Sequence, residues 1–172
     1  DCGCKHIVVN VHHFAQQIIN HVADNKWGIN VEISDESQEL LDTGGGLKKA
    51  FPLFATESPV LIHNVDIISN ADLQSFYSEN TGNAATLLVS DRQTQRYLLF
   101  DRNMKLVGWT NVSTGEIRTP FPGLDVTKCR KLAFSGIHLV RPDIVAPLME
   151  QWPDKFPIMD FYLQNCHKIE IK

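Results

Sequence analysis

The stretch LLDTGGGLKK, residues 40–49, carries the densest local signal in the sequence. Its three consecutive glycines, residues 44–46, stand where the apolar spacing predicts the start of a short helix over 46–54. Because glycine has no Cβ, the backbone amides of this run can approach a flat or anionic ligand closely. The spacing of a nucleoside-triphosphate P-loop is absent. The run therefore predicts either a ligand-binding turn, with Asp42 or Thr43 as helix cap, or simply a flexible turn.

Short apolar strands alternate with helices on both sides of this stretch. The pattern predicts strands at residues 7–11, 29–33, 60–62 and 85–89, and helices at 14–22, 46–54 and 71–77, the last of them capped by Asn70. Strand and helix alternating through short connections are typical of parallel sheets. We therefore expect an α/β fold with a mainly parallel, Rossmann-like sheet that carries helices on both faces.

The pattern changes after residue 95. Two apolar segments, 97–100 and 105–109, flank a turn-rich tetrapeptide and predict a β-hairpin. We place this hairpin in a small antiparallel insertion at about residues 96–131. A strand over 132–140, a helix beginning at Pro142, a helix over 159–166 and a strand over 169–172 follow. No linker or repeat interrupts the chain, so residues 1–172 are expected to form one domain.

Composition excludes several classes of protein. With 43% hydrophobic residues and a net charge of −4, the chain is neither disordered nor suited to non-specific nucleic-acid binding. No apolar run reaches the length of a membrane span, so no membrane partner is expected. The four cysteines are a C-x-C pair, Cys2 and Cys4, and the isolated Cys129 and Cys166. Because there is no second pair at ligand spacing, they favour free thiols in a reducing cytoplasm over a metal site or disulfides. The oligomeric state stays open.

Candidate functional residues lie where ligands bind in open α/β sheets, beyond the carboxyl ends of the strands. Asp66 follows the predicted strand over 60–62 and can hold a divalent cation that carries phosphates, or can serve as a local cap. Ser135 and Gly136 stand inside a predicted strand. A glycine there marks the close approach of a ligand, or else a bulge.

The order of these motifs resembles a known family. Five motifs follow one another along the chain: Val9-Asn10, Glu36 four residues before Leu40, the Asp-Thr-Gly-Gly-Gly run, Asn64-Val65-Asp66 and Phe134-Ser135-Gly136-Ile137. Their order resembles that in the sugar-1-phosphate nucleotidylyltransferases. The resemblance runs over the whole chain and is closest to the mannose-1-phosphate guanylyltransferases and N-acetylmuramate-1-phosphate uridylyltransferases. It implies an enzyme that converts a nucleoside triphosphate and a sugar 1-phosphate into a nucleotide sugar and pyrophosphate, for instance for bacterial cell-surface polysaccharides.

The resemblance also implies roles for single residues. Asp66 is the implied catalytic residue and ligand of Mg²⁺. Asn10, Thr43, Gly44 and Gly45 are implied to bind the nucleotide, which is GTP or UTP. Ser135 and Gly136 are implied to contact the sugar. The base and the sugar remain open, as do the roles of Lys155 and Asp160.

The chain departs from the family pattern at its ends and at one internal position. The glycine-rich loop with its Arg and Lys-Pro belongs before Asp1, the second metal-binding Asp belongs after Lys172, and Val65 replaces a common Gly. We therefore expect an internal fragment with little or no pyrophosphate release by itself. Two alternatives stay open: a non-catalytic nucleotide- or sugar-binding relative with a regulatory or assembly role, and a glycosyltransferase, whose usual Asp-x-Asp motif is absent.

Overall fold

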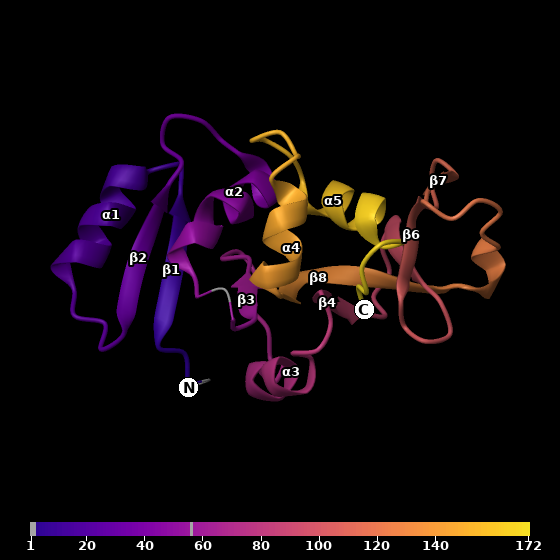
Figure 1. Ribbon diagram of the computed structural model, residues 1–172, viewed down its shortest axis with the longest axis horizontal. Helices are drawn as coiled ribbons and strands as arrows, with labels where there is room; N and C mark the ends of the chain where they lie inside the picture. The colour runs from indigo at the N-terminus through magenta and orange to yellow at the C-terminus, as the bar shows by residue number, and fades with distance from the viewer. Residues whose placement is uncertain (1–2, 56) are drawn as a thin grey trace.

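A computed structural model describes residues 3–55 and 57–172, so the predicted thiol of Cys2 lies outside the described residues. Strands β1 (His6–Val11) and β2 (Asn30–Asp35) pair in parallel, with Val8 opposite Glu32. Helix α1 (Ala15–Asp24) connects them, and helix α2 (Asp42–Ala50) follows β2. In Figure 1 these two helices flank the β1–β2 pair at one end of the molecule. This part of the chain forms the strand–helix–strand unit that the sequence predicts.

The remaining strands form a six-stranded antiparallel sheet. Its order is β3-β8-β5-β6-β7, and β4 also pairs with β8. The strands are β3 (Val60–His63), β4 (Ala85–Ser90), β5 (Arg96–Phe100), β6 (Leu106–Asn111), β7 (Glu116–Arg118) and β8 (Arg130–Val140). The sheet runs from the centre of the molecule to the end opposite α1 (Figure 1).

The expectation of one mainly parallel sheet is wrong. Strands β3 and β4, joined by helix α3 (Leu73–Glu79), do run in the same direction, but they do not pair with each other. Strand β8, which comes much later in the chain, lies between them and pairs antiparallel with both. Local alternation predicts each strand but contains no information about a distant strand that inserts between two neighbours. The fold is therefore mixed α/β.

The predicted hairpin exists as β5 and β6, with Leu98 opposite Trp109. It is an integral part of the large sheet, because β5 also pairs with β8. Leu99, Phe100 and Leu106 are fully buried there. The antiparallel part of the fold is thus larger than the small insertion that the sequence suggested, since these apolar residues belong to the main core.

Three predicted helix or strand boundaries are corrected. Helix α2 begins at Asp42, so the glycine run lies inside the helix, and residues 51–53 form a 3₁₀ turn. Helix α3 is capped by Asp72, whose carboxylate accepts hydrogen bonds from the amides of Gln74 and Ser75, and not by Asn70. The strand expected at 169–172 is reduced to a single parallel bridge between Ile171 and Ala85.

The core lies between the large sheet and the two C-terminal helices. Helix α4 (Pro142–Met149) begins at Pro142 as predicted, and helix α5 (Ile158–Asn165) follows a loop. The fully buried side chains of this core include Phe100, Val145, Met149, Phe161, Tyr162 and Ile171. Within residues 3–55 and 57–172, no helix is both long and apolar enough to cross a bilayer.

Candidate functional site

A cavity of about 620 Å³ lies over β8 at the predicted sugar residues. Its walls are Asn64, Ile67, Ile68, Ser69, Asn70, Ala71, Leu88, Val89, Ser90, Arg92, Phe134, Ser135 and Gly136. This size is in the usual range of small-molecule sites. The structure thus places Ser135 and Gly136 in a cavity that is lined by both apolar and polar side chains. We call it the sugar cavity below, after the role that the resemblance implies for these two residues.

Gly136 allows the wall of this cavity to form. Its φ is 75°, and a Cβ here would meet Ile67 Cδ1 at 2.2 Å and Asn64 Nδ2 at 3.1 Å. The amide of Asn64 donates a hydrogen bond to the carbonyl of Gly136 at 3.1 Å. The pairing of β4 with β8 shifts register in the same region, between Leu87 and Val89. Gly136 therefore belongs to a bulge, where the missing Cβ makes room for Ile67 and Asn64. The approach of a ligand to Gly136 stays a prediction.

Asp66 lies in the turn that follows β3, between two residues of the cavity wall, Asn64 and Ile67. The side chain is exposed, and within residues 3–55 and 57–172 its carboxylate has no hydrogen bond or ion pair. Those residues also contain no group of three side chains arranged to bind a metal. Mg²⁺ commonly takes one or two carboxylates and completes its shell with phosphate oxygens and water. A single unpaired carboxylate fits an ion that arrives with phosphates, so the metal role of Asp66 stays a prediction.

A second cluster gathers around Glu36, which is 5% exposed. Its carboxylate accepts hydrogen bonds from Asn10 Nδ2 at 2.7 Å and from the amide of Leu41 at 3.3 Å. Its backbone amide donates to Val11, and its carbonyl lies 2.6 Å from His12 Nδ1. In the sequence, Glu36 enters only through the motif order that carries the family resemblance. The structure shows that it ties the ends of β1 and β2 to the start of α2, which orients Asn10.

The glycine run packs against the protein. A Cβ at Gly44 would lie 2.3 Å from the Phe156 ring, and one at Gly46 would lie 2.6 Å from both Asn10 and Glu36. The amides of Gly44 and Gly45 both donate to the carbonyl of Phe156, at 2.8 and 3.2 Å. These two amides are therefore not free to bind a base. Thr43 is exposed, and its hydroxyl accepts from the amide of Ile158.

The predicted residues thus form two groups. Asn10 and the start of α2 meet around Glu36, whereas Ser135 and Gly136 meet the Asn64–Asp66 turn at the sugar cavity. The nucleotide assignment of the first group stays a prediction. Sequence reasoning missed Glu36 and Arg92, although both follow the carboxyl ends of strands, where that reasoning directed attention.

A buried pair of side chains, His138 and Tyr162, contacts the wall of the sugar cavity through Phe134. His138 of β8 lies 2.6 Å, Nδ1 to hydroxyl oxygen, from Tyr162 of α5, and its ring contacts Phe134 edge-on with 5.6 Å between centroids. Phe134 in turn lines the cavity. Burial lowers the pKa of His138 to about 3 and raises the pKa of Tyr162. Both side chains are therefore neutral at pH 7, and the pair is structural.

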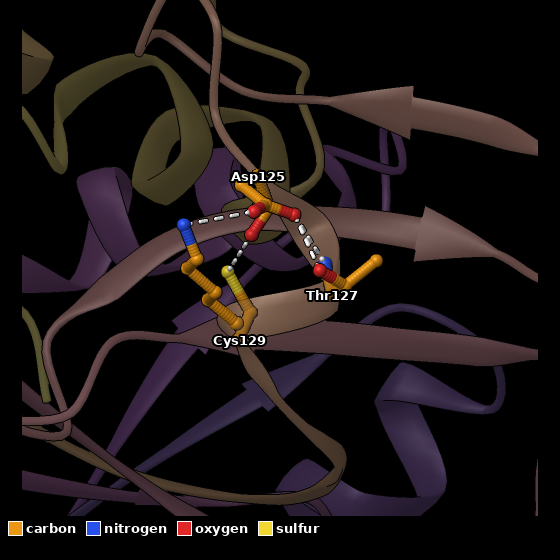
Figure 2. A network of polar contacts seen from close by, with 4 residues as sticks. Asp125, Thr127 and Cys129 are labelled. Atoms are coloured by element: carbon orange, nitrogen blue, oxygen red, sulfur yellow. Dashed lines mark hydrogen bonds and ion pairs between the residues drawn. The ribbon is translucent and has the colours of Figure 1, made fainter.

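The thiols Cys4, Cys129 and Cys166 are free. Cys129 belongs to a small polar network around Asp125 (Figure 2). Asp125 accepts hydrogen bonds from the amide and hydroxyl of Thr127 and pairs with Lys128 at 3.2 Å. Cys129 Sγ donates to the carbonyl of Asp125 at 3.6 Å. The bonds from Thr127 lower the pKa of Asp125. Burial, followed by the charges of Asp125 and Asp101, raises the pKa of Cys129.

We expect Asp125→Asn to speed the alkylation of Cys129 at pH 8, because it removes a negative charge that disfavours the thiolate. We expect a rate increase of about threefold, because the thiolate is the form that reacts. Site-resolved mass spectrometry after timed treatment with iodoacetamide measures it. Exposed Cys4 is the internal control, and its rate should not change. An equal acceleration at both thiols contradicts the electrostatic explanation.

Comparison with known proteins identifies the chain's relatives. No protein-family model matches it. N-acetylmuramate alpha-1-phosphate uridylyltransferase from Caulobacter vibrioides is 30% identical over 149 residues, which are 81% of this chain and 57% of that protein. The chain therefore spans a little more than half the length of this curated relative.

Solved structures show the same fold. HddC from Yersinia pseudotuberculosis matches with a TM-score of 0.73 and 19% identity, over 100% of this chain and 70% of that chain, both alone and complexed with GMP-PN. The inositol-1-phosphate CTP transferase from T. maritima matches with a TM-score of 0.70 and 13% identity, over 99% of this chain and 66% of that chain. The comparisons thus confirm the resemblance: the chain is homologous to an N-acetylmuramate alpha-1-phosphate uridylyltransferase over the length that the two share, and it has the fold of these solved structures.

Proposed function

We propose that the protein transfers a nucleotidyl group from a nucleoside triphosphate to a sugar 1-phosphate and releases pyrophosphate. Support comes from a curated relative that is named for such a reaction, the transfer of a uridylyl group to N-acetylmuramate 1-phosphate. The fold shared with solved nucleotidyltransferase structures supports it as well. GTP and UTP both remain candidates. The need for a nucleoside triphosphate and the free thiols favour the cytoplasm as its place of action.

The observation that carries the proposal is the sugar cavity beside the Asp66 turn. A hexose that sits on Ser135 and Gly136 has Asn64 as a wall and can direct its phosphate toward Asp66, two residues further along the chain. Ser90 and Asn70 offer further hydrogen bonds to sugar hydroxyls. The cavity is open to ligands of this size and polarity, as expected for a site that receives a phosphorylated sugar.

The reaction follows from positioning. An oxygen of the sugar phosphate forms a bond to the α-phosphorus, and the bond from this phosphorus to the oxygen that bridges to the β-phosphate breaks, so that its electron pair leaves on pyrophosphate. Asp66 would hold Mg²⁺, and the ion would supply charge neutralisation at the phosphates. The sugar cavity fixes the attacking group. Asn10, Thr43, Gly44 and Gly45 remain our proposed contacts to the nucleotide, the two glycines through groups other than the amides that Phe156 occupies, and Glu36 holds Asn10 in place.

Asp66→Asn tests this proposal. We expect a loss of about a hundredfold or more in pyrophosphate release by the full-length gene product with GTP or UTP, because the amide does not replace a charged metal ligand. Asp24→Asn removes an exposed carboxylate at the end of α1 and serves as the matched control. Full activity of Asp66→Asn contradicts the assignment.

The non-catalytic alternative is tested in the same experiments. A binding protein takes up a sugar 1-phosphate or a nucleotide, detectable by isothermal titration, yet releases no pyrophosphate from any combination of the two. Turnover with either GTP or UTP excludes that alternative and identifies the base.

A further inference from the structure

Arg92 is an unassigned residue of the sugar cavity. Among the described residues that line this cavity, it is the one ionisable side chain. The others are apolar, hydroxyl or amide side chains, together with Gly136. Within this set of wall residues, no carboxylate balances the charge of the guanidinium. The cavity therefore presents a positive charge to its occupant.

The guanidinium of Arg92 has donors to spare. Its Nη2 donates to the carbonyl of Phe134 at 3.3 Å, which places the group against the strand that carries Ser135. In the described parts of the chain, 3–55 and 57–172, Arg92 makes no ion pair. A guanidinium offers five N–H donors in a planar arrangement that matches a carboxylate or a phosphate.

The topology separates Arg92 from the predicted metal residue. Asp66 follows β3 and Arg92 follows β4, and these two strands pair with β8 on its opposite sides. Ser135 and Gly136 lie on β8 between them. A sugar whose phosphate points toward Asp66 thus presents another part of its ring to Arg92. Arg92 is placed to contact a group other than the 1-phosphate.

We propose that Arg92 is a specificity-determining residue that binds a carboxylate carried by the sugar. The preferred substrate class is a 1-phosphate of a sugar acid or of a sugar with a carboxylate-bearing ether. This inference rests on the proposed function, because it assumes that a sugar 1-phosphate occupies the cavity. A neutral sugar leaves the charge of Arg92 unmatched, whereas a carboxylate matches it with two parallel hydrogen bonds.

Two ligands that differ in this one group test the proposal. N-acetylmuramic acid 1-phosphate is N-acetylglucosamine 1-phosphate with an added carboxylate-bearing ether. We expect the protein to bind the first about ten- to a hundredfold more tightly in isothermal titration, the range for charge-assisted hydrogen bonds. Arg92→Gln should abolish this preference by weakening N-acetylmuramic acid 1-phosphate far more than the neutral sugar, and Arg92→Lys should keep part of the preference.

Arg96→Gln is the matched control, since Arg96 is also exposed and lies outside the cavity wall. Thermal unfolding of each variant checks that the fold is intact. If Arg92→Gln weakens both ligands equally, Arg92 serves the 1-phosphate; the inference is then overturned while the proposed function stands. Equal binding of both ligands by the unaltered protein also overturns the inference about Arg92 and leaves the proposed function standing. Binding of neither ligand overturns the inference, and pyrophosphate release with other sugar 1-phosphates then decides whether the proposed function stands.

Discussion

Gly45→Ala is expected to lower the free energy of unfolding by about 3 kcal/mol or more, because the new methyl group cannot be accommodated. An alanine Cβ at this position would lie 1.9 Å from the carbonyl oxygen of Asp154 and 3.0 Å from its carbonyl carbon. Both are backbone atoms, so no side-chain rotation relieves the contact. Either α2 or the loop at Asp154 must move.

The loop cannot move without losing several bonds to α2. Lys48 Nζ donates to the carbonyl of Trp152 at 2.8 Å and to Asp154 Oδ1 at 3.0 Å. The amide of Phe156 donates a hydrogen bond to the carbonyl of Leu41, and the carbonyl of Phe156 accepts hydrogen bonds from the amides of Gly44 and Gly45. A displaced loop therefore leaves buried backbone groups without partners, which adds to the cost.

Urea unfolding followed by tryptophan fluorescence measures the effect. Gly82→Ala is the control, because a Cβ there meets no atom within 4 Å. We expect this variant to unfold near the midpoint of the unaltered protein. A Gly45→Ala protein that stays within about 1 kcal/mol of it refutes the packing argument.

Acid is expected to destabilise the fold through His138. In the folded protein, burial holds the pKa of His138 at about 3, whereas a histidine in an unfolded chain titrates near 6.5. Between these values the unfolded state binds a proton that the folded state does not. The stability contributed by the neutral imidazole is therefore complete above about pH 6.5 and falls as the pH drops toward 3, by about 1.4 kcal/mol for each pH unit.

The double variant His138→Phe/Tyr162→Phe isolates this effect. Replacing both partners avoids leaving one buried polar group alone, since the two side chains hydrogen bond to each other. We expect its unfolding free energy to depend less on pH between 6.5 and 4 than that of the unaltered protein, as measured by urea titrations at a series of pH values. Exposed His167, replaced by Gln, is the control and should keep the original slope. An unchanged slope in the double variant means that other groups cause the acid sensitivity.

Local sequence patterns predicted most helices and strands because periodicity records which face of an element is buried. The strand over 7–11, the hairpin around residues 101–104 and the helix that begins at Pro142 all follow from such patterns. The same patterns placed Asp66 just after β3 and Ser135 on β8. Their meeting at one cavity depends on strand pairing that neither local segment records.

The glycine run shows why a motif alone leaves two outcomes open. A missing Cβ allows a ligand to come close, but it equally allows another backbone to come close. At Gly44 and Gly45 the neighbour is the segment around Asp154 and Phe156, more than a hundred residues away in the chain. The structure assigns these glycines to packing and leaves their predicted role toward the nucleotide to experiment.

The sequence by itself determined most of the elements, the order of the motifs and the family resemblance, because these depend on residue type and spacing along the chain. Only the tertiary structure decided that β8 separates β3 from β4, that Glu36 is buried beside Asn10 and that Arg92 lines the sugar cavity. Each of these depends on contacts between distant segments. Long-range strand pairing and burial are properties of the whole packed chain, and no local window of sequence contains them.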